Sequence, residues 1–273
     1  MGSINELGLI DRLFSIVNNS QDANDPDNVL ADYFLTHYAQ LNAINVWDIA
    51  DACFVSRSSV RRFCQRIGFD NYRQLKDEMR RYNHSYEYFM REATQDNYKD
   101  RFSEELIAMA REMNERCDIT EMDHICSRIH DAERVLLLTS YSSFSCVHEF
   151  QRPLVLSGKV CRLMSDIAID DDYLRRMQDT DYLVVCSAMG TYARTIKPII
   201  SNCAAEKVLI TASRSEDLKD GFDRVYHLSA RDYNGVKSWY GKYGMFYFFD
   251  VLYSEYVRQY GTEFQKNVPK DPD

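Results

Sequence analysis

Residues 46–82 read VWDIADACFVSRSSVRRFCQRIGFDNYRQLKDEMRRY, and this stretch decides the fold of the N-terminal part of the chain. Two short helical patterns are separated by the turn Phe54-Val55. The first pattern covers Trp47 to Cys53. The second follows Ser56, a residue type that favours helix N-caps, and extends to about Ile67. Two helices joined by such a turn predict a helix-turn-helix unit that binds DNA.

The second helix of this unit has an apolar face and a polar face. The apolar residues recur at helical spacing and are expected in the core: Val60, Phe63, Cys64 and Ile67. Arginine can bond guanine edges twice, and serine and glutamine can contact bases or phosphates. The residues predicted at the DNA interface, with Ser56 also as the cap, are Ser56, Arg57, Ser58, Ser59, Arg61, Arg62 and Gln65. Arg62 adjoins Phe63 and could instead contact phosphate or an acidic partner such as Asp48.

The stretch is basic within an acidic chain. Residues 46–82 hold eight basic and five acidic side chains, whereas the whole chain has a formal net charge of -9. Clustered Lys and Arg neutralise DNA phosphates, so a basic island favours a local nucleic-acid surface. The alternative is a structural helix pair with ordinary surface charge.

Length and composition limit the remaining possibilities. The 273 residues predict more than one domain, and 45% hydrophobic residues with a mean hydropathy of -0.45 are typical of a globular protein. The N-terminal sequence MGSINELGLIDRL lacks signal-peptide features, and no apolar run could span a bilayer, so we expect a cytoplasmic protein. Eight cysteines without a CxxC pair favour reduced, buried thiols, and neither a metal nor a cofactor is expected.

The pattern around the helix-turn-helix predicts an all-α domain over residues 1–82. Helices are expected over Ile4 to Val17 and Asn28 to Leu41, with a polar loop over Asn18 to Asn28 between them. Residues 83–118 are expected to form a helical connection.

From Thr120 onward, apolar runs alternate with helical patterns. The expected strands are Arg134 to Leu138, Lys159 to Met164, Asp181 to Ser187, Lys207 to Thr211 and Arg224 to Leu228. The expected helices are Ser145 to Ser157, Asp171 to Met177 and Thr191 to Ala204. This alternation predicts an α/β domain over residues 119–262, in which helices cover both faces of a parallel five-stranded sheet, and residues 263–273 are expected to form a disordered tail. Ligands of such sheets bind at the carboxyl ends of the strands.

The run VSRSSVRRFCQRIGFDNYRQLK resembles the V-S-x-x-[ST]-V-x-R-F-x-x-x-[LI]-G-[FY] signature of RpiR-type transcriptional regulators. The motif positions are occupied by Val55, Ser56, Ser59, Val60, Arg62, Phe63, Gly68 and Phe69. The following region is similar to the sugar isomerase (SIS) domain of those regulators. The resemblance implies a flavodoxin-like SIS domain that senses a phosphorylated sugar and dimerises.

The same resemblance implies an effector site, from which this chain departs at two loops. The family's G-x-G-x-S turn is Thr139-Ser140-Tyr141-Ser142-Ser143, without either glycine, and its S-x-S-G-x-T loop is Ser187-Ala188-Met189-Gly190-Thr191-Tyr192. The residues expected to bind the effector are Ser140, Ser142, Ser143, Ser187, Gly190 and Thr191. Three interpretations stay open: a phosphosugar, an altered metabolite because Tyr141, Met189 and Tyr192 add bulk, or a vestigial site used for assembly.

An enzyme is the alternative function, because SIS folds also serve as sugar-phosphate isomerases, which need a general base. His148-Glu149 is the adjacent pair of that type near the first SIS loop, and we interpret it as surface residues of a helix. We therefore expect no catalysis.

The segment Tyr243 to Tyr260, YGMFYFFDVLYSEYVRQY, predicts a strongly aromatic helix. Core packing explains part of this composition, and a subunit interface would explain the remainder. A homodimer, or a higher homo-oligomer, would present two reading helices to a pseudo-palindromic operator in double-stranded DNA, with half-sites about one helical turn or a multiple of it apart.

Overall fold

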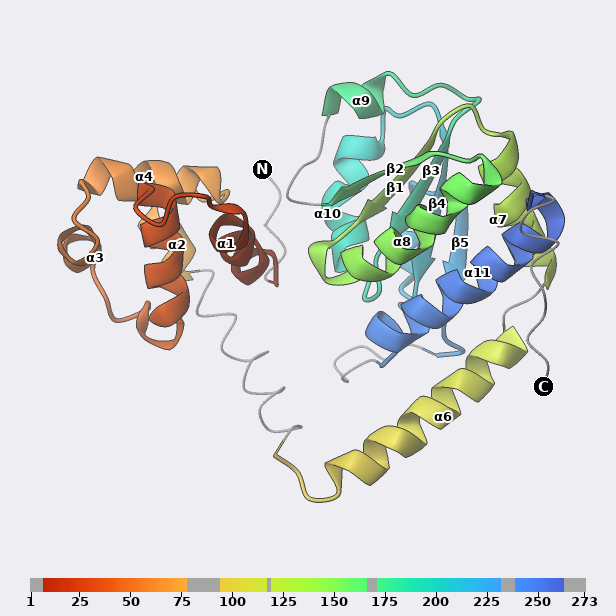
Figure 1. Cartoon of the computed structure of the whole chain (residues 1–273), viewed down its shortest axis with the longest axis horizontal. Helices are drawn as coiled ribbons and strands as arrows, with labels where there is room; N and C mark the ends of the chain where they lie inside the picture. Colours follow the sequence, from red (N-terminus) through yellow and green to blue (C-terminus); the bar gives the residue numbers. More distant parts are fainter. Residues whose placement is uncertain (1–6, 78–93, 117–118, 166–170, 232–238, 263–273) are drawn as a thin grey trace. The chain divides into compact units, whose positions relative to one another are not determined.

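The computed structural model describes residues 7–77, 94–116, 119–165, 171–231 and 239–262 (Figure 1). The chain divides into two units, Met1–Tyr98 and Lys99–Asp273. Each unit has its own hydrophobic core and is described by itself.

The described part of the first unit is entirely helical, as the sequence predicted. Its elements are α1 (Leu7–Asn19), α2 (Pro26–Thr36), a 3-10 turn (Tyr38–Gln40), α3 (Val46–Ala52), α4 (Arg57–Arg66) and helical residues 72–77. Helix α2 begins two residues before the expected Asn28, because the Asp25 side chain accepts hydrogen bonds from the backbone N–H groups of Asp27 and Asn28. Phe34 and Phe63 make a T-shaped, edge-to-face contact in the core, with ring centroids 5.3 Å apart.

The helix-turn-helix unit is formed by α3 and α4. Asn45 caps α3 and Ser56 caps α4, and the turn between them passes through Phe54 with φ +54°. Helix α4 is followed by its C-cap Ile67 and by Gly68, whose φ of +93° allows Phe69 N to donate to Cys64 O at 2.8 Å and close the helix. The four residues predicted for the apolar face of this helix are buried, which confirms the predicted pattern.

The second unit contains a parallel five-stranded sheet with the strand order β2-β1-β3-β4-β5. The strands are β1 (Val135–Thr139), β2 (Cys161–Ser165), β3 (Tyr182–Cys186), β4 (Glu206–Thr211) and β5 (Arg224–His227). Each lies within two residues of its predicted range at both ends. The three central strands are almost entirely buried, because helices cover both faces of the sheet.

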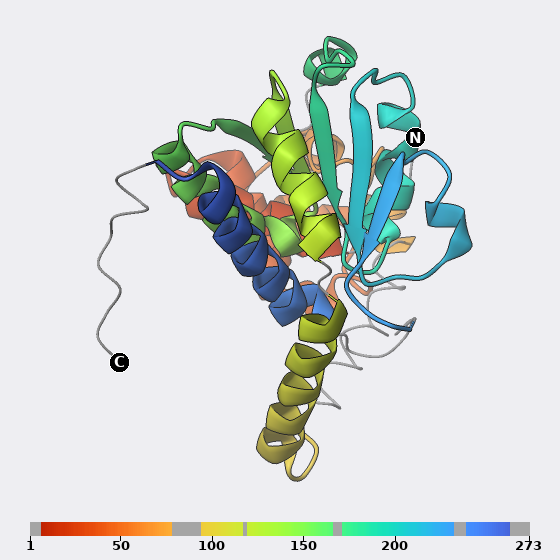
Figure 2. The same cartoon turned by 90° about the vertical axis from the view of Figure 1, so that its right-hand side faces the viewer.

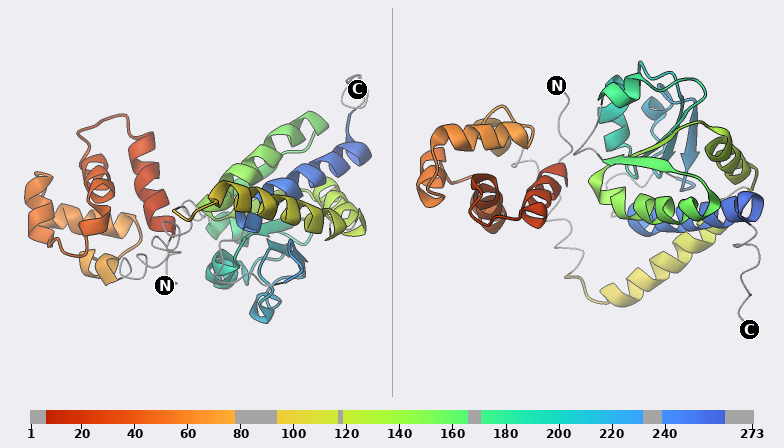
Figure 3. Two further views of the ribbon diagram at one scale, coloured as in Figure 1. Left: turned by 90° about the horizontal axis from the view of Figure 1, so that it is seen from below. Right: turned by 45° about the horizontal axis from the view of Figure 1, so that its top comes forward.

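The helices form two layers around this sheet. They are α6 (Tyr98–Arg116), α7 (Ile119–Asp131), α8 (Tyr141–Leu154), α9 (Asp171–Arg175), α10 (Thr191–Ile200) and α11 (Met245–Tyr260), the last of which follows a π-helical turn (Tyr240–Gly244). Helices α8 and α11 lie side by side on one face, and α7 contacts α11 (Figures 2 and 3). Helices α9 and α10 pack against the opposite face. Successive residues of β1 alternate between the two cores, as period-2 geometry requires.

Helix α6 differs from the expectation of a connecting segment over residues 83–118. The chain divides at Tyr98, and α6 packs within the second unit because Met109 and Met113 on its apolar face are buried in the core there. The tail that was predicted over residues 263–273 lies outside the described residues.

Seven cysteines lie among the described residues, and all seven are buried and free of disulfides. Within the described ranges, no group of three or more His, Cys, Asp or Glu side chains could hold a metal ion. Over the same ranges, no helix has the length and apolarity needed to cross a membrane.

Candidate nucleic-acid interface and effector site

A network of hydroxyl groups holds the first turn of α4. The Ser56 Oγ accepts a hydrogen bond from Ser59 N at 3.1 Å and lies 2.6 Å from Ser58 Oγ. Arg62 Nη2 donates to Ser59 Oγ at 3.2 Å. Arg62 is exposed, and among the residues that the structure describes it forms no ion pair with Asp48. Its guanidinium group is oriented by the contact with the Ser59 hydroxyl.

A polar ridge runs along the exposed side of α4, and we define it as Ser58, Arg61, Arg62 and Gln65. These positions follow the spacing i, i+3, i+4, i+7, which places them on one helix face. All four side chains are exposed, whereas α4 buries Val60, Phe63 and Cys64 in the core. The ridge therefore presents donors and acceptors from a helix anchored by its opposite face.

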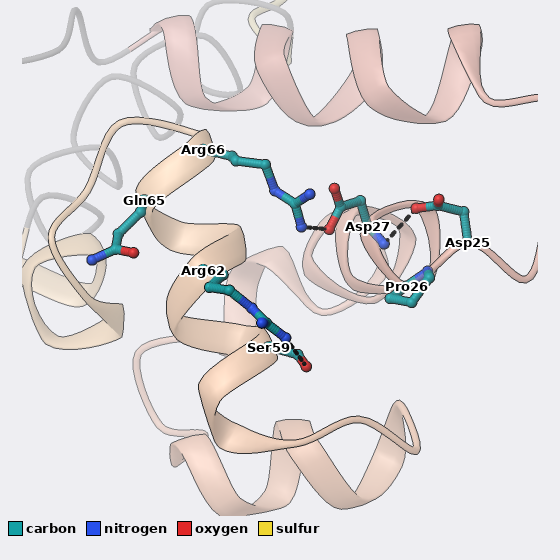
Figure 4. A pocket seen from close by; sticks show the side chains of 7 residues that line it. All are labelled: Asp25, Pro26, Asp27, Ser59, Arg62, Gln65 and Arg66. Atoms are coloured by element: carbon teal, nitrogen blue, oxygen red, sulfur yellow. Dashed lines mark hydrogen bonds and ion pairs between the residues drawn. The ribbon is translucent and has the colours of Figure 1, made fainter.

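Hollows flank the ridge on its two sides. The first, of about 630 Å³, lies between α4 and the start of α2, and is lined by Asp25, Pro26, Asp27, Ser59, Arg62, Gln65 and Arg66 (Figure 4). Arg66 forms an ion pair with Asp27 across it, while Gln65 points away from Asp27. The carboxylates of Asp25 and Asp27 make this side less attractive to phosphate.

The second hollow, of about 610 Å³, is basic. It is lined by Asn45, Val46, Arg57, Arg61, Asn71, Tyr72, Arg73, Lys76 and Asp77. The capped N-terminus of α3 lies at this hollow, and helix N-termini favour phosphate oxygens. Arg57 is held there by Trp47, because its guanidinium carbon lies 3.4 Å from the centroid of the Trp47 ring.

The sequence-based selection omitted four residues of the basic side: Asn45, Trp47, Arg73 and Lys76. Arg73 and Lys76 contributed to the predicted positive charge, but their place beside α4 depends on the helical residues 72–77. That segment is tied down by Tyr72, whose hydroxyl donates to Leu41 O at 2.7 Å, and by Lys76, whose Nζ donates to Ile44 O at 3.0 Å.

The two expected effector loops lie side by side in the second unit. Thr139 and Cys186 are partners in the register of β1 and β3, so the segments that begin at Ser140 and Ser187 leave neighbouring strands at the same carboxyl edge. The sequence predicted both loops at carboxyl ends of strands, and the strand order makes them neighbours.

The loop after β1 contains a buried hydroxyl group. Ser143 is 2% exposed, and its Oγ has no hydrogen-bond partner among the described residues. A buried hydroxyl is normally bonded, so this oxygen has unused capacity for a ligand. Ser140 is the N-cap residue of α8, and the side chain of Ser142 is not among those that the structure describes.

The loop after β3 leads into α10. Gly190 has φ +79°, and a Cβ at this position would lie 2.6 Å from Leu218 Cδ1, so any other residue would be both strained and crowded here. Ser187 Oγ accepts from Ala193 N at 3.1 Å, which commits this hydroxyl to the helix start. Thr191 is exposed in the first turn. Tyr192 is buried in the core and adds almost no surface to the loops.

His148 and Glu149 lie on α8, as their interpretation as helix residues predicted. The His148 ring stacks on Phe144 with centroids 5.7 Å apart, and Glu149 forms an ion pair with Arg152 at 2.8 Å. Both side chains are thus engaged along the helix.

The aromatic C-terminal helix is largely explained by core packing. Helix α11 buries five residues, Met245, Phe248, Phe249, Leu252 and Tyr256. Further aromatic residues that pack partly against this core are Phe246, Tyr247, Tyr253 and Tyr260.

Comparison with known proteins agrees with this architecture. Residues 10–85 match the model of the helix-turn-helix domain, rpiR family. An uncharacterized HTH-type transcriptional regulator in the aarA 3' region of Providencia stuartii is 24% identical over 190 residues, which cover 67% of this chain and 66% of that protein. The match thus spans just under two thirds of the relative's length.

Two solved structures share the fold. The Vibrio vulnificus NanR protein complexed with ManNAc-6P has a TM-score of 0.53 and 17% identity, covering 95% of this chain and 94% of NanR. The sugar isomerase domain of an RpiR transcription factor from Sphaerobacter thermophilus has a TM-score of 0.50 and 14% identity, covering 61% of this chain and 92% of that domain.

The fold, the capped α4 and these matches define a class of protein: a helix-turn-helix domain joined to an α/β domain whose fold is similar to that of a sugar isomerase domain. Residues 10–85 thus form a helix-turn-helix domain of the rpiR family.

Proposed function

We propose that α4 enters the major groove of an operator and that its polar ridge contacts the bases. The observation that carries this proposal is the exposure of Ser58, Arg61, Arg62 and Gln65 on one face of a helix whose other face is buried. A recognition helix needs this division between an anchored face and a reading face.

The groups beside the ridge are proposed to contact phosphate. Arg57, Arg73 and Lys76 surround the N-terminus of α3 in the basic hollow, and positive side chains at a helix N-terminus suit phosphate oxygens. Ser56 and Ser59 support α4 through the hydroxyl network, and their hydroxyls remain near enough to the helix start to meet the backbone of DNA.

Arg61→Ala tests whether Arg61 contacts a base or a phosphate in this interface. If Arg61 reads a base, the variant weakens specific binding by about 1 to 3 kcal/mol and relaxes the preference at one base pair. If it contacts phosphate, affinity falls equally for all sequences and the salt dependence becomes shallower. Arg152→Ala on α8 is a matched control, because this arginine belongs to the second unit. Unchanged affinity in Arg61→Ala would remove Arg61 from the interface.

We further propose that the two loops at the carboxyl ends of β1 and β3 bind a phosphosugar. Support comes from the unbonded buried hydroxyl of Ser143 and from the backbone N–H groups that begin α10 after Gly190. The likeness in fold to NanR, which was solved with ManNAc-6P, agrees with this class of ligand. A phosphosugar should raise the melting temperature of the wild type, and Ser143→Ala should reduce that increase.

The site is proposed to bind its ligand without catalysis. A sugar-phosphate isomerase needs a base aimed at the sugar carbons, and Glu149 is instead paired with Arg152. Incubation of the protein with ribose 5-phosphate or fructose 6-phosphate should give no aldose–ketose conversion. Conversion of many substrate molecules by each protein molecule would support the isomerase alternative.

We propose a homodimer that places two α4 helices on a pseudo-palindromic operator. Aromatic side chains of α11 that stay partly exposed, such as Tyr247 and Tyr253, suit a subunit interface. Sedimentation of the full chain at micromolar concentration should give the mass of a dimer or of a higher oligomer, and a monomer would contradict the arrangement.

A further inference from the structure

Three half-buried basic side chains come together near the carboxyl ends of β4 and β5: Arg116, Arg214 and His227. Arg116 ends α6, Arg214 follows β4, and His227 is the last residue of β5. Arg214 donates to Ser229 O from Nε at 2.8 Å and from Nη2 at 2.5 Å. We name these three residues the basic cluster.

The positive charges of the basic cluster act on one another. Burial and the charge of Arg116 lower the pKa of Arg214. Burial lowers the pKa of His227 most, and the charge of Arg214 lowers it next; the hydrogen bond to Ser213 O opposes this shift, and the charge of Arg116 adds a smaller lowering. The like charges therefore lie close enough together to destabilise one another.

The nearby carboxylate is already occupied by other donors. Glu112 partly offsets the charge of Arg214, but its Oε1 accepts from Ala230 N at 2.5 Å and its Oε2 accepts from the Tyr240 hydroxyl at 2.5 Å. Neither Arg116 nor Arg214 has an ion pair within 4.0 Å among the residues that the structure describes.

Other arginines of this unit behave differently. Arg128, Arg134 and Arg194 each pair with a carboxylate: Arg128 with Glu206 at 2.6 Å, Arg134 with Asp181 at 2.5 Å and Arg194 with Asp217 at 2.6 Å. By contrast, Arg116 Nε is buried with no hydrogen-bond partner in the described part of the chain. Charges that are partly buried are normally paired. The basic cluster therefore lacks the carboxylate partner that each of the three other arginines has.

The strand end that leads to Arg214 contacts one of the proposed phosphosugar loops. Ala212 N donates to Ala188 O at 2.9 Å, and Thr211 Oγ1 donates to the same oxygen at 3.2 Å. The end of β4, which leads to Arg214, is thus bonded to the loop between Ser187 and Thr191. A small ligand at these loops would have the basic cluster beside it along the edge of the sheet.

We propose that the basic cluster is a second anion-binding subsite that accepts a phosphate or carboxylate group of the effector. This inference rests on the proposed phosphosugar site and narrows its ligand to a sugar derivative with two anionic groups, such as a sugar bisphosphate or a phosphorylated sugar acid. Arginine suits both groups, because its planar donors match carboxylate and phosphate oxygens.

Inorganic phosphate is the probe for this subsite. The full chain is labelled with ¹³C-histidine, the His227 signal is assigned by its absence in His227→Gln, and phosphate is titrated at constant ionic strength against chloride. We expect a saturable shift of the His227 signal with phosphate, because an anion beside the ring stabilises its protonated form. Arg116→Gln should weaken phosphate binding about tenfold or more, since a hydrogen bond to a charged group is lost.

The controls separate folding, the subsite and the phosphosugar site. Arg116 makes no hydrogen bond or ion pair among the described residues, so Arg116→Gln should keep the melting temperature of the wild type, and Arg258→Gln on α11 controls for the loss of one positive charge. Ser143→Ala should leave the His227 response intact. A sugar phosphate that binds through Ser143 without moving the His227 signal would retain the proposed function and refute the subsite. A His227 response in a protein that binds no sugar phosphate would retain the subsite and refute the proposed function. The inference is overturned if phosphate shifts the His227 signal no more than chloride does. It is also overturned if phosphate shifts this signal equally in the wild type and in Arg116→Gln.

Discussion

The guanidinium carbon of Arg57 lies 3.4 Å from the centroid of the Trp47 ring, and this contact joins the two helices of the helix-turn-helix unit. Arg57 is the first residue of α4, and Trp47 is the second residue of α3. Trp47 is 57% exposed, so little of its surface contributes to the core. The ring instead holds a positive charge at the basic hollow.

Trp47→Ala tests whether this contact prepares Arg57 for DNA. Arg57 keeps its charge in the variant but loses its fixed position, so we expect weaker operator binding with an almost unchanged dependence on salt. Trp47→Phe retains an aromatic face and should bind nearly as well as the wild type. Fluorescence anisotropy at several salt concentrations measures both quantities, and equal affinity in the alanine variant would show that the contact is irrelevant to binding.

Phe54→Asn should stabilise the first unit. Phe54 has φ +54°, which is unfavourable for a residue with a bulky side chain and acceptable for asparagine, and its side chain is 97% exposed and so buries little apolar surface. We expect the free energy of unfolding to rise by about 1 kcal/mol. Phe14→Asn, a matched change at an exposed phenylalanine of α1, should lower it. Urea denaturation of both variants provides the comparison; a loss of stability in Phe54→Asn contradicts the expectation.

Gly190→Ala and Gly158→Ala separate backbone strain from a steric clash. The two glycines have φ of +79° and +76°, but an added Cβ meets Leu218 Cδ1 at 2.6 Å at Gly190 and nothing within 4 Å at Gly158. Both variants should lose about 1 to 2 kcal/mol of stability from strain, with a further loss in Gly190→Ala alone. Calorimetric melting temperatures check this order, and equal losses would mean that the loop before α10 adapts without cost.

His227 should make the second unit less stable in acid. Burial and the charges of Arg214, Arg116 and Lys219 lower its pKa below the ordinary value of 6.5, against its hydrogen bond to Ser213 O. The unfolded chain therefore binds the proton at higher pH than the folded chain, so the contribution of His227 to stability is intact above about pH 6.5 and is lost as the pH falls through that value toward the folded pKa. His227→Gln should reduce the fall in melting temperature over this range, whereas His148→Gln on α8 should not. Identical pH profiles for His227→Gln and the wild type would oppose this role.

The sequence predicted the fold closely where local signals were strong. The Ser56 cap, the apolar face of α4 and the five strands were predicted within two residues, because each depends on local pattern and propensity. Helix α7 (Ile119–Asp131) was not predicted, although Met122, Ile125, Cys126 and Ile129 recur at helical spacing, and this signal could have revealed it.

The sites were predictable to different degrees. The polar ridge follows from the 3.6-residue period of one helix, so Ser58 to Gln65 could be selected from the sequence alone. The ion pair of Arg66 with Asp27 and the position of Lys76 require tertiary packing, as does the basic cluster, whose members Arg116 and Arg214 are far apart in the chain. The hydroxyl of Ser187 accepts a hydrogen bond from Ala193 N in α10, a contact that its place in the loop did not indicate, and its role toward a ligand stays a prediction.

The most direct test of the central claim is the selection of bound fragments from random-sequence DNA by the full chain, in parallel with a variant in which Ser58, Arg61, Arg62 and Gln65 are alanine. These residues are exposed, so the variant should fold with an unchanged melting temperature. We expect the wild type to recover a pseudo-palindromic sequence and the variant to bind DNA without enriching any sequence, because its phosphate contacts remain. Recovery of the same sequence by the variant would contradict base reading by α4.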